Sequence, residues 1–303
     1  GSLLVALLAT ASASTIVDLI LNENEERSVS GNHLEAVSTV LVRTGSTLSL
    51  LNATLLKATQ VTVMDGGTLS FMGGCLSGDS WAPLNSSAVV VEVTNALQVQ
   101  AGGAIYACGL TIVAGNIDVQ SSSRISADSL GYQADHGPLG KCDTLDQLQC
   151  IGAGYGGSHA RPGAGGYGGD GGNGAYWQEG WSGIYNKTGG LAYGSASVPV
   201  DAGSGGDSDA NVCTNSGSTG GAGGGALRLR TQDGGTFMLN GTLSANGEGK
   251  GNSCGPGSGG AAGVVHKGCH SCISPRCAQS VCPAPPPLSH PPSAHPYRPP
   301  RPS

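Results

Sequence analysis

The sequence predicts an all-β protein whose short strands stack into a right-handed parallel β-helix, a type of solenoid. This solenoid is expected to carry long glycine-rich insertions and a Cys- and Pro-rich tail. Three observations predict it: a β-rich segment that repeats, a scarcity of aromatic residues, and a concentration of glycine in the second half of the chain. Phe, Trp and Tyr make up only 4% of the 303 residues, so a thick globular core built on aromatic side chains is not expected.

The repeat is the strongest of these signals. Residues 42–50 align with residues 63–71 at an offset of 21 residues (66 − 45 for the paired glycines), and the phrase returns at residues 233–239. A β-rich unit this short cannot bury its own apolar face and must stack on its neighbours. We therefore expect parallel ladders among seven short strands: 40–42, 61–63, 68–71, 110–112, 117–119, 227–229 and 237–239.

Within a repeat, apolar and polar residues alternate, as in Leu48-Ser49-Leu50, which places the apolar set on one face. Glycine between the strands supplies the positive φ values of tight turns, and parallel crossovers within a sheet are right-handed. An antiparallel β-sandwich is the alternative, since it also has short strands and frequent turns. The near-constant phrase Gly-Gly/Ser-Thr-Leu/Phe favours the solenoid.

Composition divides the chain into six segments. Residues 1–21 are either a signal peptide, because a short apolar run precedes the small-x-small pattern Ala11-Ser12-Ala13, or the first strands of the body. The run is too short to span a bilayer. The remaining segments are solenoid rungs (22–135), a glycine-rich insertion (136–225), a further rung with a short glycine-rich loop (226–263), a Cys-rich segment (264–282) and a Pro-rich disordered tail (283–303).

The order of motifs in residues 100–263 is specific. A glycine-rich tract at 152–206 leads to Gly-Gly-Ala-Gly-Gly-Gly-Ala at 220–226, then two short strands and the turn Ser-Ala-Asn-Gly at 244–247. This order resembles a group of glycine-rich secreted proteins with pectin-lyase-like β-helix architecture. The resemblance implies a cell-surface, wall or matrix protein. Seven Tyr and Trp residues between 155 and 193 are expected to anchor the tract on the body, with sugar stacking as the alternative.

Several features indicate an extracellular location. Four N-x-S/T sequons predict glycosylation at Asn52, Asn85, Asn186 and Asn240. The ten cysteines are interpreted as disulfides rather than thiols. The candidates are Cys142, Cys150, Cys213, Cys254, Cys269, Cys272, Cys277 and Cys282. We expect a Cys142–Cys150 bridge and, as a second pair, Cys213–Cys254. A zinc site in the Cys-rich segment is the less favoured interpretation.

Other classes of ligand are not expected. Charged residues make up 11% of the chain and the net charge is −6, with no basic stripe to attract nucleic acid. The Asp and Asn residues at 169–174 and 201–209 lack the nonapeptide period of calcium-binding β-rolls. No Walker lysine follows the glycine tracts. We therefore predict no cofactor and no metal.

A catalytic role is also not assigned. Polysaccharide lyases on this fold gather carboxylates and a basic residue on one sheet; the nearest candidates are Asp118 and Arg124 on one rung and Arg228 and Arg230 on another. The sequence therefore favours a non-catalytic extracellular structural or adhesive glycoprotein of a cell wall, matrix or surface appendage such as a flagellar hair (mastigoneme). Its partners would be wall or matrix polysaccharides and glycoproteins, or further copies of itself. The alternatives are a carbohydrate-acting enzyme and a glycan-binding adhesin module.

Overall fold

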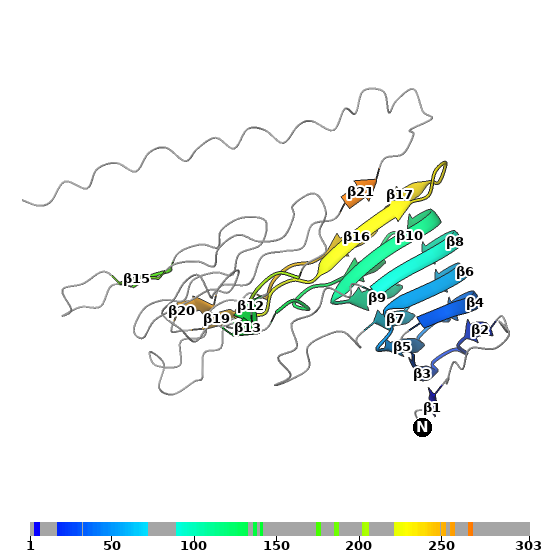
Figure 1. Cartoon of the computed structure of the whole chain (residues 1–303), viewed down its shortest axis with the longest axis horizontal. Helices are drawn as coiled ribbons and strands as arrows, with labels where there is room; N and C mark the ends of the chain where they lie inside the picture. Colours follow the sequence, from blue (N-terminus) through cyan, green and yellow to red (C-terminus); the bar gives the residue numbers. More distant parts are fainter. Residues whose placement is uncertain are drawn as a thin grey trace, which may run out of the picture. The chain divides into compact units, whose positions relative to one another are not determined.

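A computed structural model gives the structure of the chain. It describes residues 3–6, 17–31, 33–71, 89–132, 136–137, 140–141, 174–176, 185–187, 202–205, 221–248, 250–252, 255–257 and 266–268. Every regular element in these residues is a β-strand, as the sequence predicts. Two large sheets form the body (Figure 1).

All strand pairs in the two large sheets are parallel. Sheet A contains β1 (Leu3–Ala6), β3 (Glu26–Ser30), β5 (Thr47–Leu51), β7 (Thr68–Phe71), β9 (Ala104–Ala107), β11 (Arg124–Ser126) and β18 (Thr242–Ser244), in that order. Sheet B contains β2 (Val17–Ile20), β4 (His33–Val42), β6 (Leu55–Val63), β8 (Val89–Val99), β10 (Gly109–Val119), β16 (Ala226–Thr231) and β21 (His266–Gly268), and β17 (Phe237–Leu239) also pairs with β10. The parallel pairing excludes the antiparallel sandwich.

Three small antiparallel pairs complete the described strands. They are β12 (His136–Gly137) with β13 (Gly140–Lys141), β14 (Gly174–Tyr176) with β15 (Tyr185–Lys187), and β19 (Lys250–Asn252) with β20 (Gly255–Gly257). Each is two or three residues long, so these pairs contribute little to the hydrogen bonding that holds the body together.

The chain alternates between the two large sheets, so the body is built in layers. One layer is a strand of sheet B, the turn after it and a strand of sheet A. Val40 pairs with Val61 and Thr47 with Thr68, which confirms the predicted offset of 21 residues. Leu110 pairs with Leu227, and Ile117 with Phe237. The predicted ladders are confirmed even across the long glycine-rich insertion.

The strands of sheet B are longer than predicted because they bend rather than end. Segments 110–112 and 117–119, predicted as separate strands, are the two halves of β10. At the bend two successive residues, such as Thr59-Gln60 in β6 and Thr94-Asn95 in β8, are exposed, and the register shifts at the same place. Side chains alternate between the two faces along a strand. Two successive outward residues shift this alternation by one position, so the apolar residues of the second half again face inward.

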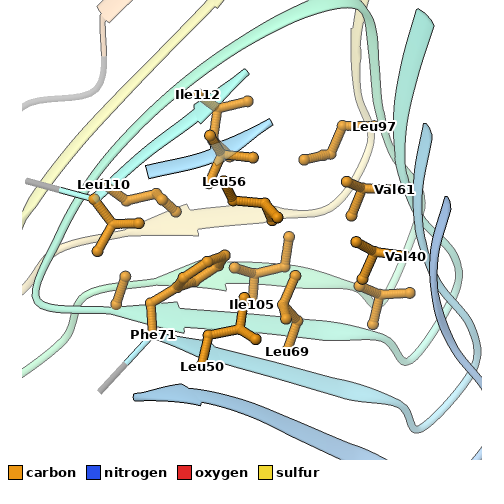
Figure 2. Packing of buried hydrophobic residues seen from close by; sticks show 14 of the residues in the cluster. Val40, Leu50, Leu56, Val61, Leu69, Phe71, Leu97, Ile105, Leu110 and Ile112 are labelled. Carbon is orange, nitrogen blue, oxygen red and sulfur yellow. The ribbon is translucent and has the colours of Figure 1, made fainter. Parts of the chain in front are cut away.

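The core lies between the sheets and consists of inward ladders. Figure 2 shows Leu56, Leu110 and Ile112 from one side of the bend facing Leu69 and Ile105 of sheet A. These side chains are fully buried, with exposed fractions of 0–1%. Burial of each stabilises the fold by about 1.5–3 kcal/mol. Aliphatic ladders therefore replace the aromatic residues that the composition lacks.

The turn from sheet B to sheet A has the same form in five successive layers. Each spans four residues and is closed by a hydrogen bond from the fourth N–H to the first carbonyl, as from Gly67 to Met64 at 2.9 Å. The third residue is left-handed in every layer. These residues are Asn24, Gly45, Gly66, Gly102 and Ser122, with φ between 56° and 77°. Glycine favours this conformation, which explains the paired glycines of the repeat.

Candidate functional site

All the long connections of the body leave from the other corner, where the chain passes from sheet A to sheet B. The connection after β7 holds 17 residues (88 − 71), and that after β11 runs from residue 127 to residue 225. Loops gathered on a rigid scaffold are where binding function usually resides. This corner and the adjoining outer face of sheet A are therefore the candidate site.

Four segments, 127–132, 202–205, 221–225 and 244–248, form what we call the glycine bundle; the first begins with a turn in which Ser129 is left-handed, with a φ of 56°. Tyr132 N–H donates to the Gly203 carbonyl at 2.9 Å, and Gly203 N–H donates to Gly224 at 2.6 Å. Gly131 N–H donates to Gly223 at 2.7 Å. Three segments are thus mutually hydrogen-bonded. Two strands flanking a third in a flat sheet are too far apart to bond to each other, so this is a bundle and not a sheet.

The fourth segment, 244–248, is also hydrogen-bonded to two others, 127–132 and 221–225. Ala127 N–H donates to the Ser244 carbonyl at 2.8 Å, and Glu248 N–H donates to Ala222 at 2.8 Å, while Gly225 N–H donates to Ala127 at 2.7 Å. The segments therefore fix one another without a β-ladder.

Glycine is required in the bundle because the backbones touch. A β-carbon on Gly223 would overlap the Gly203 carbonyl oxygen, and one on Gly224 would overlap the Ala245 carbonyl oxygen. Residues 202–205 and 221–225 are buried. These parts of the predicted glycine-rich insertion are therefore ordered by backbone contact. The aromatic residues predicted to anchor the tract, apart from the backbone of Tyr176 and Tyr185, lie outside the described residues.

Asp128 joins the bundle to the last strands of sheet A. Its carboxylate accepts hydrogen bonds from the Asn246 N–H at 2.6 Å and the Ser244 hydroxyl at 2.7 Å. Partial burial raises the pKa of Asp128, but these hydrogen bonds outweigh it and lower the pKa from 3.8. The ionised carboxylate is thus the form that holds the two segments together.

The outer face of sheet A carries rows of short polar side chains. One row follows the register from Ser28 through Ser49, Ser70, Tyr106 and Ser126 to Ser244. Toward the β18 end of this face, the Arg124 guanidinium lies 5.8 Å from the centre of the Tyr106 ring, within the range of a cation–π contact. Ser70 and Ser126 of this row are buried, whereas Ser28, Ser49, Tyr106 and Ser244 are partly exposed. The partly exposed hydroxyl groups and the Tyr106 ring are of the kinds that contact sugars.

The four charged residues that came nearest to a lyase-like set, although no active site was assigned to them, are not all brought together. Asp118 lies on β10 of sheet B and Arg124 on β11 of sheet A. Arg228 is in register with Thr111, seven residues from Asp118 along the same strand (118 − 111). Arg228 and Arg230 do share the outer face of β16, between the buried Leu227 and Leu229. The Asp118 carboxylate instead accepts a hydrogen bond from Gln120 at 3.3 Å.

Two pairs of polar side chains approach each other on the outer face of sheet B. The ammonium group of Lys57 lies 3.7 Å from the Glu92 carboxylate on the neighbouring strand. His33 and Glu35 approach within 3.9 Å on β4. Both pairs are exposed, so each contributes at most about 1 kcal/mol. This face is a solvated surface in the part of the chain that the structure describes.

The predicted glycosylation sites have different positions. Asn52 and Asn240 are exposed in the connections after β5 and β17. Asn186 lies in β15, paired with Ala175. Asn85 lies outside the described residues.

The disulfide candidates cannot be placed in the same way. Cys142, Cys150, Cys213, Cys254, Cys269, Cys272, Cys277 and Cys282 all lie outside the described residues. The structure instead shows a disulfide at Cys108, which the sequence did not single out. Cys108 is buried directly after β9, and its carbonyl accepts the Ala226 N–H at 2.9 Å. Its place two residues before the predicted strand at 110–112 was the signal that could have identified it.

Among the described residues, no group of three or more His, Cys, Asp or Glu side chains is placed to hold a metal ion. Within the same residues, no helix is long and apolar enough to cross a membrane. No family model, curated protein or solved structure matches the chain.

Proposed function

We propose that this chain is a non-catalytic structural or adhesive glycoprotein of a cell wall, extracellular matrix or surface appendage, built on a right-handed parallel β-helix. The observation that carries the proposal is the unbroken stacking of layers: inward aliphatic ladders run through both parallel sheets, and the same four-residue turn joins them in five layers. A body of this kind gains stability from each added layer and presents long, regular outer faces.

Three further features support an extracellular role. Cys108 is disulfide-bonded, and disulfides persist in oxidising compartments. Asn52 and Asn240 present exposed sequons. The described glycine-bundle segments are held largely by backbone hydrogen bonds, with the Asp128 and Glu248 carboxylates accepting further backbone N–H groups. A durable scaffold exposed to the environment would combine these properties.

Location and glycosylation test this proposal directly. Antibodies against the recombinant chain should recover it from the wall or matrix fraction of the source cells, as a species whose electrophoretic mobility increases after enzymatic removal of N-glycans. Recovery of an unmodified chain from the cytosol would contradict the proposal.

The enzyme alternative has its own test. Purified protein incubated with pectin, alginate and related polyuronates in the presence of calcium should release no new reducing or unsaturated ends. Cleavage that Asp118→Asn or Arg228→Ala abolished would replace the scaffold proposal with a catalytic one.

Glycan adhesion is favoured by one specific observation, the Tyr106–Arg124 contact among the hydroxyl groups of sheet A. If this face binds sugars, a Tyr106→Ala variant should lose at least tenfold in affinity for the polysaccharide that wild-type protein selects on a glycan array. Arg230→Ala, on the outer face of sheet B, is the matched control and should bind normally. Equal binding by wild type and Tyr106→Ala would assign adhesion to another surface.

A further inference from the structure

The layer stack has an unfinished apolar end at β17 and β18. One inward ladder runs in register from Val63 through Val99 and Val119 to Leu239. The three valines are fully buried, whereas Leu239 is 43% exposed. The preceding Met238, in register with Asp118 on the opposite, outer face of the strand, is 51% exposed. The ladder therefore ends at Leu239 without a cover among the described residues, while β21 continues sheet B beside β16. With Leu239 on one face of β17 and Met238 on the other, this strand end is an exposed apolar edge, the Met238–Leu239 patch.

The opposite end of the same ladder is closed. Leu21, whose N–H bonds to the Leu41 carbonyl next to Val42, is fully buried. Charged side chains also mark that end, where Arg27 pairs with Glu25. By contrast, β17 consists of Phe, Met and Leu and contains none of the charged or proline residues that protect natural edge strands. Within the described residues, β17 pairs with β10 alone.

A sequon follows this apolar patch without a gap. Asn240 is exposed directly after Leu239, and Thr242 of the same sequon is also exposed. Two hydrogen bonds to the Val119 carbonyl, from the N–H groups of Asn240 and Gly241 at 2.8 and 3.0 Å, fix the backbone here. A glycan on Asn240 would therefore begin beside Met238 and Leu239. The sequon at Asn52 differs, because its neighbour Ala53 is buried.

We infer that an N-linked glycan on Asn240 covers the Met238–Leu239 patch and prevents this end of the stack from associating with a second copy of the chain. The inference rests on the proposed extracellular role. In the modification, the Asn240 side-chain nitrogen bonds to C1 of the first sugar, the bond from C1 to the diphosphate of a lipid-linked oligosaccharide breaks, and the nitrogen loses one proton. The C–H faces of the first sugars then lie over the apolar side chains, and their hydroxyl groups face water.

The test uses the full chain secreted from a glycosylating eukaryotic host, as wild type and as the variants Asn240→Gln and Asn52→Gln. Glycopeptide mass spectrometry should find Asn240 occupied. Sedimentation should then show that Asn240→Gln self-associates at concentrations at least tenfold lower than wild type, whereas Asn52→Gln behaves as wild type. Adding Met238→Ser to Asn240→Gln should restore the wild-type behaviour. Enzymatic deglycosylation of folded wild-type protein gives the same comparison if Asn240→Gln fails to fold.

The outcomes separate this inference from the proposed function. Occupancy of Asn52 without occupancy of Asn240 would overturn the inference and leave the extracellular proposal intact. A monomeric Asn240→Gln or deglycosylated protein would also overturn it. Absence of glycan at both positions would count against the extracellular proposal and the inference together.

Discussion

The Asp128 carboxylate links two distant segments at the junction of sheet A and the glycine bundle. It contacts Ser244 and Asn246, which lie 116 and 118 residues away in sequence. The Asp128 backbone N–H also donates to the Ser126 hydroxyl at 3.1 Å. The carboxylate therefore holds the last layer against the preceding one across the longest insertion in the chain.

The Asp128→Asn variant tests this role. Because the native pKa of Asp128 is lowered from 3.8, the carboxylate stabilises the fold above pH 3.8, and this contribution is lost as the pH falls through the native pKa. At neutral pH we expect the variant to lose about 1 kcal/mol of unfolding free energy, since hydrogen bonds to a charged group are weakened but the site is partly exposed. Urea unfolding across the acid range should show the two proteins converging at low pH.

Asp118→Asn is the matched control, because its hydrogen bond partner is the neighbouring Gln120 side chain on the surface. It should leave the unfolding free energy unchanged at neutral pH. A constant difference between Asp128→Asn and wild type at every pH would show that the carboxylate charge does not hold the segments together.

The contacts of single residues were harder to predict from the sequence than the strands or the layers. The exposure of Asn52 and Asn240 agrees with their sequons, but a sequon does not reveal whether an apolar patch adjoins it. Asp128 looked like any turn-forming aspartate, since its partners are more than a hundred residues away. Contacts of this range depend on the stacking of layers and leave no local pattern.

At the scale of elements, the glycine bundle depends on the absence of side chains. Gly223→Ala should destabilise the protein by about 1–3 kcal/mol, because the added methyl group forces apart the backbones of segments 202–205 and 221–225. Gly31→Ala is the control, since a β-carbon there meets only the Leu34 side chain at 3.6 Å. Thermal unfolding followed by circular dichroism measures both. Equal melting temperatures for the two variants would mean that the bundle adjusts to a methyl group.

The strands were predicted better than their bends. Alternation of apolar and polar residues located both halves of β10, but the pair Gly115-Asn116 between them was interpreted as a break. Gly115 has a different reason to be there: a β-carbon at this position would overlap the carbonyl oxygens of Thr94 and Asn95 in β8. Sequence alone does not distinguish a glycine that ends a strand from one that admits the neighbouring strand at a bend.

At the scale of the whole molecule, layers should be removable. Deleting residues 43–63, 21 residues (63 − 42), joins Val42 to Met64 and leaves the turn and register of the following layer intact. We expect the shortened chain to fold, with parallel-sheet circular dichroism and a cooperative transition at a lower temperature than wild type. Deletion of residues 43–62 removes one residue fewer and joins Val42 to Val63. The extra residue shifts the register by one, so that the apolar side chains on one side of the junction face outward. That control should fail to fold, and two equally folded deletions would contradict the layered stack.

The order and register of the layers were the most predictable feature, because the sequence repeats. The pairing of Val40 with Val61 and of Leu110 with Leu227 could be predicted from recurring sequence motifs. The motifs recur because each layer packs against neighbouring layers of the same form. The register between β10 and β16 could be predicted although the glycine-rich insertion separates these strands by about a third of the chain. What the repeat could not supply was the path of the insertion, which is set by contacts between backbones rather than by side-chain pattern.

The difference between the two corners of the body determines where the chain can change in length. From sheet B to sheet A, four residues with one left-handed member are hydrogen-bonded in place in five successive layers, so an inserted residue would shift every strand after it. From sheet A to sheet B, the connection ranges from one residue after β9, through 17 after β7, to the whole of residues 127–225 after β11. Insertions and deletions accumulated over evolution should therefore fall at one corner only, and a foreign peptide grafted after Leu51 would be displayed without altering the stack.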